Sequence, residues 1–440
     1  MKPNILFILV DSMRADKFFP KNQTKKFQNI LDNGIYFEQN ISSSDYTVTG
    51  VGSIFTACYP FDAGLKGQSF HKLYATKDNY IEFLKRNGYH AYATMAESVA
   101  ELGFSKLFEN KDQSYPNSLR LFDGLGEKIL NLLNSGRFSE PWIYFIHLED
   151  LHLPVLLPSK YSHVKYSDRY DLAIYEIHSW IDKFTRTVNL ENCLVVITSD
   201  HGDYIPLIDD SIDLDSTISK TKSLIRKNLP SNIYGLASKT KQNFQKTTRK
   251  AQAKSSYEKR AIDSRTGKNR YLYDEMIRTP LFFTGFGISS QKTIHQQVRS
   301  IDIFPTICDI FDLHSFEAKI NGQSLKPLFE NKSIEELPVY LESTVFATIQ
   351  KNAIAHLGIR TPKFKYFRKA EDPTENIHLY DLENDSFEEN NISSENPDII
   401  EKMEKEIKKI RSESVKQQLD ELSLEETKKV EDELRKLGYL

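Results

Sequence analysis

Cysteine is scarce in this 440-residue sequence, where Cys58, Cys193 and Cys308 are the only three. A sparse, odd set of cysteines excludes a disulfide framework and a thiolate metal site. Long apolar runs are missing as well, since no stretch approaches the roughly 20 apolar residues that cross a bilayer. The run Ile5–Val10 is too short for a signal-peptide core and ends directly in Asp11, so it predicts a strand of the mature protein. The expected compartment is the cytoplasm, with peripheral attachment to the inner face of the membrane left open.

An excess of charge of one sign is also absent, because the sequence has 58 Lys and Arg residues and 61 Asp and Glu residues. The formal net charge of −3 implies nothing about partners overall, so electrostatic arguments must be local. No nucleic-acid partner is expected. Residues 220–270 are locally basic, with 15 Lys or Arg residues and only two acids. We interpret it as a basic insertion in the catalytic domain, at about 205–270. It is either a solvated loop or a lid that recruits a large anionic substrate or an anionic membrane surface. The basic residues selected to test the second alternative are Arg249, Lys250, Lys259 and Arg260.

The apolar runs that are present alternate with segments of helical periodicity, such as Tyr80–Asn87 and Asp171–Asn189. This alternation predicts an α/β fold with a largely parallel sheet covered by helices on both faces. The expected buried strands are Asn4–Val10, His90–Met95, Trp142–His147, Cys193–Thr198 and Pro280–Thr284.

A second pattern begins at about residue 336, where short strand candidates precede a charged helical tail from Pro397. The strand candidates are Val339–Leu341, Phe364–Arg368 and His378–Leu382. We therefore expect a catalytic domain over 1–335 and a smaller C-terminal α+β subdomain over 336–440.

Acids and histidines follow three of the predicted strands. Asp11 follows the first strand, His147 and His152 come at and after the third, and Asp200 with His201 follows the fourth. Because parallel strands deliver their carboxyl ends to one edge, these side chains are expected to meet there. An adjacent Asp and His suit a divalent cation with mixed nitrogen and oxygen ligands. Taken alone, the pair is equally compatible with a solvated acid beside a structural histidine.

Thr47 precedes Thr49–Phe55, a predicted helix start. Backbone N–H groups and the helix dipole favour an anion there and lower the cost of an alkoxide. A threonine hydroxyl at its ordinary pKa is a poor nucleophile, so it needs a base or a metal. The alternative is a structural hydroxyl that caps the helix or a turn.

Three motifs in the first half of the chain resemble the sulfatase family of the alkaline phosphatase superfamily. Pro3–Arg14 resembles the family's opening strand, in which the first Asp binds metal. Ser53–Pro60 resembles the TG-x-YP segment, and the family's spacing back from its proline puts the nucleophile at Thr47. Thr198–Asp203 resembles the TSDHGE metal-binding turn. The match continues in order through Leu272–Leu281, Ile301–Thr306, Asn321–Leu325, Leu379–Leu382 and Leu437–Leu440. The resemblance implies an alkaline-phosphatase-like fold.

Departures from the sulfatase pattern separate this chain from formylglycine enzymes. The stretch from Thr47 lacks the C/S-x-P-x-R signature, and threonine cannot become formylglycine. Ser12 replaces the second Asp of the family's DD, and Met95–Ser98 replaces its GKWH segment. An acid, a threonine and an Asp-His pair instead resemble the one-metal site of lipoteichoic acid synthases and phosphoethanolamine transferases, which form a phosphothreonine intermediate.

This second resemblance implies one divalent metal, with Mn or Zn favoured and Ca or Mg compatible. Its ligands would be Asp11, Thr47, Asp200 and His201. Thr47 would attack an anionic phosphoester, lipid-linked or glycan-linked, in cell-envelope or polysaccharide metabolism, with water or an alcohol as acceptor. Two alternatives stay open, a sulfatase that works without formylglycine and a catalytically silent homologue that acts as a binding protein.

Three further residues receive roles from the resemblance. His147–Pro154 is similar to an H-x-x-D-x-H-x-P segment of related hydrolases. It implies that His152 protonates the leaving oxygen or contacts the phosphoryl group. His147 is either structural or a contact of the substrate. Lys268 lies four residues before Leu272, where relatives carry Lys or His facing the substrate anion, or else it is a solvated lysine of the insertion.

Overall fold

The protein is described here from a computed structural model. The structure describes residues 2–19, 30, 32–63, 79–101, 103–152, 154–205, 255–266, 271–289, 291–314, 316, 319–343, 354–413 and 428.

A mixed sheet of eight strands forms the centre of the molecule, in the order β4-β3-β5-β1-β6-β7-β2-β8. Five of its seven pairings are parallel, and only β7 runs against its two neighbours, β6 and β2. The strands are β1 (Asn4–Val10), β2 (Gly34–Ile41), β3 (His90–Ala96), β4 (Ser114–Tyr115), β5 (Trp142–Leu148), β6 (Cys193–Thr198), β7 (Arg278–Gly285) and β8 (Lys292–Arg299). The predicted α/β class with a mostly parallel sheet is confirmed.

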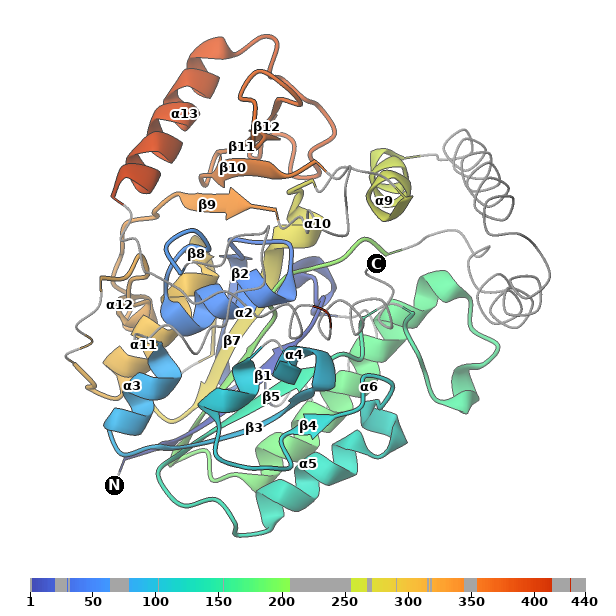
Figure 1. Cartoon of the computed structure of the whole chain (residues 1–440), viewed down its shortest axis with the longest axis vertical. Helices are drawn as coiled ribbons and strands as arrows, with labels where there is room; N and C mark the ends of the chain where they lie inside the picture. The colour runs from blue at the N-terminus through green and yellow to red at the C-terminus, as the bar shows by residue number, and fades with distance from the viewer. Residues whose placement is uncertain are drawn as a thin grey trace.

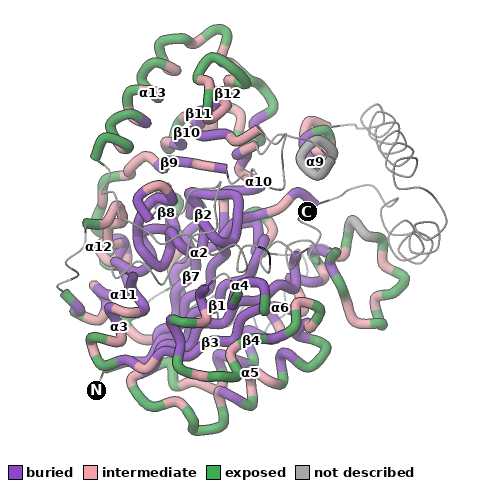
Figure 2. Tube along the Cα trace, viewed as in Figure 1, coloured by how far each residue is buried: buried purple, intermediate pink, exposed green. Residues whose placement is uncertain are grey.

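Helices cover both faces of this sheet because its central strands are apolar on both sides. The alternate residues Ile5, Phe7 and Leu9 of β1 pack into one core, and Leu6, Ile8 and Val10 pack into the other. The first core contains side chains of α2 (Thr47–Thr56), α3 (Tyr80–Arg86) and α11 (Ile303–Ile310), and the second contains side chains of α5 (Leu125–Asn134) and α6 (Tyr166–Thr187). Figure 1 shows these two helical layers on opposite sides of β1 and β5, and Figure 2 shows the strands buried between them.

Short helices connect the larger elements. They are α4 (Glu97–Glu101), α10 (Asp274–Ile277), α12 (Lys326–Phe329) and the 3-10 turns η1 (Ala15–Lys17), η3 (Phe104–Leu107), η4 (Leu121–Asp123), η5 (Ser159–Tyr161) and η7 (Ser300–Asp302). No helix in the described ranges combines the length and the apolar character that crossing a bilayer requires.

A separate antiparallel sheet follows, in the order β12-β11-β10-β9, with α13 (Pro397–Ser412) packed on it. Its strands are β9 (Val339–Glu342), β10 (His356–Arg360), β11 (Phe364–Lys369) and β12 (His378–Asp381). The separate C-terminal sheet and the helix from Pro397 agree with the expected α+β subdomain. The boundary at 335 and 336 stays a prediction.

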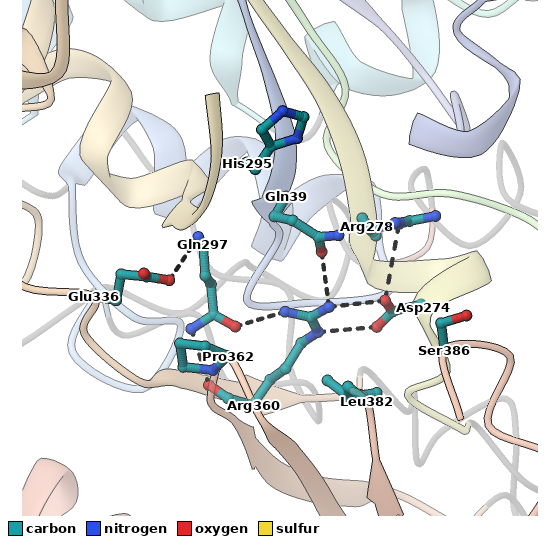
Figure 3. Close-up of a pocket in the computed structure, with 10 residues that line it drawn as sticks. All are labelled: Gln39, Asp274, Arg278, His295, Gln297, Glu336, Arg360, Pro362, Leu382 and Ser386. Atoms are coloured by element: carbon teal, nitrogen blue, oxygen red, sulfur yellow. Dashed lines mark hydrogen bonds and ion pairs between the residues drawn. The ribbon is translucent and has the colours of Figure 1, made fainter. Parts of the chain in front are cut away.

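The two sheets are joined by backbone pairing and by buried ion pairs. The Glu342 N–H donates to the Ser43 carbonyl at 3.0 Å, which ties β9 to the loop before α2. Asp274 accepts from Arg360 Nη2 at 3.0 Å and from Lys365 Nζ at 2.8 Å. Asp274 and Arg360 line a cleft of about 150 Å³, drawn in Figure 3, whose lining shares no residue with the Asp11–Asp200–His201 group.

The described end of the basic insertion is α9 (Ser256–Thr266), and it corrects one expectation. Arg260 is only 8% exposed, forms an ion pair with Glu275 and stacks on the Tyr273 ring, 4.5 Å from its centroid. A guanidinium held in this way cannot recruit a substrate, so its selection as a recruiting residue was wrong. Lys259 is exposed, whereas Arg249 and Lys250 lie outside the described residues.

Candidate active site

The metal ligands predicted from the sequence come together at the carboxyl edge of the central sheet. Asp11 directly follows β1, and Asp200 and His201 follow β6, the parallel neighbour of β1. One ligand atom from each of the three residues lies within 4.8 Å of the other two, and all three side chains are buried. The expected meeting of strand ends is therefore present, while the role of each residue stays a prediction.

The His201 ring is oriented for ligation. Its Nδ1 lies 2.7 Å from the Gly202 carbonyl oxygen. Because a carbonyl oxygen only accepts, Nδ1 carries the proton in this contact, and in the neutral ring Nε2 then presents its lone pair. Nε2 lies 3.7 Å from Asp11 Oδ1 and 3.6 Å from Asp200 Oδ2. A backbone carbonyl that sets the tautomer in this way is the usual support of a metal-binding histidine.

One oxygen of each carboxylate is held by a neighbour in the sequence. Asp11 Oδ1 accepts from the Ser12 hydroxyl at 2.7 Å, and Asp200 Oδ1 accepts from the His201 N–H at 3.0 Å. Asp200 Oδ2 is buried without a hydrogen-bond partner in the described chain. A buried carboxylate oxygen without a hydrogen-bond partner destabilises the folded state unless a cation or a hydrogen-bond donor contacts it.

The electrostatics of the group are those of a site that needs a cation. Burial, followed by the charge of Asp11, raises the pKa of Asp200 to about 6. Burial alone would lower the pKa of His201, but the charges of Asp200 and Asp11 outweigh it and raise that pKa to about 9. Two carboxylates and an imidazole closed off from water match the mixed ligands that Zn and Mn accept. The donor set therefore fits one divalent ion.

The Thr47 hydroxyl joins this group. Its Oγ1 donates to Asp11 Oδ2 at 3.1 Å and lies 3.2 Å from His201 Nε2. Thr47 is the first residue of α2, whose cap residue is Tyr46, and no side chain caps this helix. The hydroxyl is thus directed to the ligand group, and the structural alternative of a helix cap is not realised.

The two histidines of the β5 segment lie near Asp11. His147 Nε2 is 3.7 Å from Asp11 Oδ2, and neither ring nitrogen has a hydrogen-bond partner within the described ranges. Burial lowers the pKa of His147 to about 4. Burial also lowers the pKa of His152, while the charges of Asp11 and Asp203 oppose the shift. Lys268 lies outside the described residues, so its proposed contact stays a prediction.

Several positioning contacts had no clear signal in the sequence. The Tyr170 hydroxyl, from near the start of α6, donates to the Ser12 carbonyl at 2.6 Å and accepts from the Arg14 N–H at 3.0 Å. Ser12 has the left-handed φ of 64°, which its contacts with Asp11 and Tyr170 offset. Ser199 Oγ accepts from the Met13 N–H at 3.0 Å and joins the two ligand turns. Ser199 adjoins Asp200 in the sequence, but nothing local points to Tyr170.

Comparisons with known proteins agree with this geometry. Residues 3–313 match the Sulfatase family, and residues 265–413 match the C-terminal region of N-sulphoglucosamine sulphohydrolase. Arylsulfatase K of Mus musculus is 28% identical over 156 residues, which are 34% of this chain and 28% of that protein. A delta 4,5-hexuronate-2-O-sulfatase of Bacteroides thetaiotaomicron is 28% identical over 131 residues, 29% of this chain and 27% of that protein. The matched stretches thus cover less than a third of these relatives' own length.

Solved structures show the same fold over nearly the whole chain. A 2-O GAG sulfatase superposes with a TM-score of 0.64 at 15% identity, covering 96% of this chain and 95% of that one. A phosphonate monoester hydrolase of Agrobacterium radiobacter superposes with a TM-score of 0.61 at 13% identity, covering 94% and 96%. With the family match over most of its length, the chain belongs to the sulfatase family.

Proposed function

We propose that this protein is a metal-dependent phosphoester hydrolase or phospho-group transferase in which Thr47 is the nucleophile. The observation that carries the proposal is the position of Thr47 Oγ1, 3.1 Å from Asp11 Oδ2 and 3.2 Å from His201 Nε2. By the family's spacing back from Pro60, Thr47 takes the place of the formylglycine of sulfatases, and threonine has no route to that aldehyde. The nucleophile is therefore an ordinary hydroxyl, whose covalent product is an ester of threonine.

The residues that would hold the divalent ion are Asp11, Asp200 and His201, with Thr47 Oγ1 beside them. When bound there, the ion supplies Lewis acidity, which lowers the pKa of a hydroxyl and neutralises charge on an anionic ester. The start of α2 adds backbone N–H groups that favour the same anion. The site thus combines a positioned hydroxyl with two sources of anion stabilisation.

In the proposed first step, a bond forms between Thr47 Oγ1 and phosphorus as the bond from phosphorus to the leaving alcohol oxygen breaks. The Asp11 carboxylate is within hydrogen-bond distance to receive the threonine proton. His152 donates a proton to the leaving oxygen, because the charge of an anionic ester favours the protonated imidazole. His147 contacts the phosphoryl group from the buried side.

In the second step, water or an alcohol attacks the phosphothreonine and its proton passes to His152. The threonine oxygen leaves with its electron pair and takes back the proton that Asp11 received in the first step, so the free enzyme is restored. The identity of this acceptor decides whether the enzyme is a hydrolase or a transferase.

A sulfate ester is the second candidate substrate. Its support is the sequence likeness to arylsulfatase K and to the hexuronate sulfatase, whose names describe sulfate esters. The same hydroxyl and the same anion contacts would serve sulfur in place of phosphorus. A comparison of matched esters therefore separates the two candidates.

The test is a panel of 4-nitrophenyl phosphate, bis(4-nitrophenyl) phosphate, phenyl phosphonate and 4-nitrophenyl sulfate, each with Mn, Zn, Ca or Mg. We expect turnover of a phosphorus ester to exceed turnover of the sulfate, Thr47→Ala to be inactive, and Thr47→Ser to retain part of the activity. A radiolabelled phosphate ester should leave label on a peptide that contains Thr47. Full turnover by Thr47→Ala would refute the covalent role, and a preference for the sulfate would select the second candidate.

A further inference from the structure

The hydroxyl group of Tyr257, in α9, connects the two turns that carry the proposed metal ligands. The first turn is Asp11–Arg14 and the second is Asp200–Ile205. The Tyr257 hydroxyl accepts from Arg14 Nη1 at 2.8 Å and from the Ile205 N–H at 2.8 Å, and it donates to the Ile205 carbonyl oxygen at 3.1 Å. A phenolic hydroxyl has one proton to donate and two lone pairs, so these three bonds use all of its capacity.

The side chain of Arg14 is fixed in one orientation. Its Nε and Nη2 donate to the carboxylate of Asp16 at 2.8 and 2.7 Å, and its guanidinium carbon lies 5.1 Å from the centroid of the Tyr257 ring. Arg14 is only 7% exposed, and the Tyr257 hydroxyl is the hydrogen-bond partner of Nη1 in the described chain. A buried donor that loses its partner destabilises the arrangement around it. The position of the Arg14 side chain therefore depends on Tyr257.

The aliphatic part of Arg14 packs against Gly202, the residue whose carbonyl orients the ring of His201. A Cβ on Gly202 would clash with the Glu275 carbonyl oxygen and would lie 3.2 Å from Arg14 Cγ. The Gly202 N–H donates to the Met276 carbonyl oxygen at 2.7 Å, and the Gly202 carbonyl oxygen lies 2.7 Å from His201 Nδ1. Arg14 thus forms one wall of the narrow space that fixes the carbonyl behind His201, and α10 forms the other.

Ser199 provides another link between the two turns, at the opposite end of the second one. Its Oγ accepts from the Met13 N–H at 3.0 Å, and Ser199 directly precedes the second turn. Ser199 therefore fixes the start of that turn, whereas Tyr257 fixes its end at Ile205. Both proposed ligands of the second turn lie between these two fixed points.

Tyr257 is distant from both turns along the chain, since it lies 52 residues after Ile205. Its helix is anchored by a further contact, the ion pair of Arg260 with Glu275 of α10. The backbone of α10 also contacts Gly202. Helix α9 therefore supports the second turn directly through Tyr257 and indirectly through α10.

We propose that Tyr257 is a positioning residue of the metal site, which holds the Asp11–Arg14 and Asp200–Ile205 turns at the separation that ligation requires. The inference rests on the proposed metal site and does not depend on the chemistry of Thr47. It makes α9 part of the active-site architecture, as the segment of the insertion that stabilises the ligand geometry. Metal binding and the contact of α9 are then coupled, so each stabilises the other.

The test compares the unsubstituted protein with Tyr257→Phe, which removes the hydroxyl and keeps the ring. The readouts are the Kd of Mn²⁺ by calorimetry and the visible absorption of bound Co²⁺, which reports the geometry of its ligands. We expect the Kd to rise about tenfold to a hundredfold, as when the group that orients a metal ligand is lost, and the Co²⁺ absorption to change. A residue that only stabilised the fold would lower the melting temperature and leave both readouts of the folded protein unchanged.

Tyr366→Phe is the matched control, because it removes a tyrosine hydroxyl that donates to Glu404 at 2.8 Å beside the C-terminal sheet. The Kd of Mn²⁺ and the Co²⁺ absorption should be the same in this variant as in the unsubstituted protein. The same Kd and absorption in Tyr257→Phe would overturn the inference alone. Absence of metal binding by the unsubstituted protein would refute the proposed metal site and the inference with it.

A second measurement needs no variant and decides the question if Tyr257→Phe fails to fold. Amide hydrogen exchange is measured in the unsubstituted protein with and without Mn²⁺. Because the coupling is reciprocal, exchange in α9 and at Ile205 should slow several-fold when the metal binds, with α13 as the unaffected reference. Exchange in α9 that does not respond to bound metal would overturn the inference.

Discussion

Gly50 of α2 packs directly against the backbone of Asp200, because a Cβ on Gly50 would lie 2.7 Å from the Asp200 carbonyl oxygen. The helix that begins at Thr47 and the turn that carries the proposed metal ligands Asp200 and His201 are therefore in contact at a position where any side chain would force a shift. The Asp200 carbonyl also accepts from the Ser42 hydroxyl at 2.5 Å, so it cannot move freely. This contact sets the distance between the proposed nucleophile and its ligand group.

Gly50→Ala is expected to displace the ligand turn from Thr47. Overpacking a tight contact costs about 1–3 kcal/mol in stability, and the ligand geometry should suffer with it. We expect the variant to remain folded, with metal affinity lowered about tenfold or more, as measured by calorimetric titration with Mn or Zn. Metal affinity equal to that of the unsubstituted protein would show that the turn and the helix adjust independently.

Metal binding is expected to release a proton at neutral pH. Without metal, the charges of Asp200 and Asp11 raise the pKa of His201 to about 9, whereas ligation requires the neutral ring. Metal affinity should therefore weaken as the pH falls below about 9, and calorimetry in buffers of different ionisation enthalpy should report about one proton released. Asp200→Asn removes the carboxylate that acts most strongly on His201 and should reduce this release. A pH-independent affinity between pH 6 and 9 would contradict the assignment.

Addition of a chelator is expected to lower the melting temperature. A ligand that binds only the folded state stabilises it by about 2.7 kcal/mol at a concentration of 100 times its Kd. The melting temperature of Asp200→Ala should not respond to the chelator, because its ligand set is incomplete. An equal response in both proteins would place the metal elsewhere.

Asp274 is expected to stabilise the junction between the two sheets in a pH-dependent way. Burial raises its pKa, but the charges of Arg360, Lys365 and Arg278 outweigh burial and hold the pKa well below its ordinary value. Stability from a depressed carboxyl pKa is fully present above the unfolded pKa, about 4, and is lost as the pH falls further. Asp274→Asn should therefore cost about 3 kcal/mol or more at pH 7, and the difference from the unsubstituted protein should shrink below pH 4.

Urea unfolding between pH 3 and pH 7 checks this prediction. Glu383→Gln is the control, since its ion pair with Lys363 joins two side chains that are more than half exposed. Such surface pairs contribute about 0–1 kcal/mol. A loss for Asp274→Asn no larger than that of the control would mean that the buried pairs do not hold the sheets together.

Arg260 and its neighbour Lys259 are expected to behave differently although both belong to the basic insertion. Arg260→Ala breaks the buried pair with Glu275 and should destabilise the protein by about 3 kcal/mol. Lys259→Ala removes an exposed side chain and should change stability by no more than about 0.5 kcal/mol. Thermal unfolding of the two variants measures the difference. Equal melting temperatures would restore the interpretation of α9 as a solvated part of the insertion.

Local patterns predicted the elements that are buried on both faces. β1 is apolar at every position after Asn4, and β5 and β6 are nearly as apolar, which indicates central strands of an α/β protein. In contrast, β2 (Gly34–Ile41) was missed, because Glu38 and Gln39 interrupt its apolar pattern where the strand carries a bulge. The predicted helix Asp171–Asn189 begins earlier, at Tyr166, because its polar first turn shows little periodicity.

The sequence by itself determined which residues could bind a metal and which edge of the sheet would carry them, because residue type and position directly after a strand are local properties. The sequence by itself also determined that the formylglycine signature is absent at Thr47. Only the tertiary structure decided that Tyr170 supports the Ser12 turn, that Gly50 touches Asp200 and that Arg260 is buried in an ion pair. A hydrogen bond or a close approach depends on partners that are distant along the chain, and packing alone brings those partners together or leaves them apart.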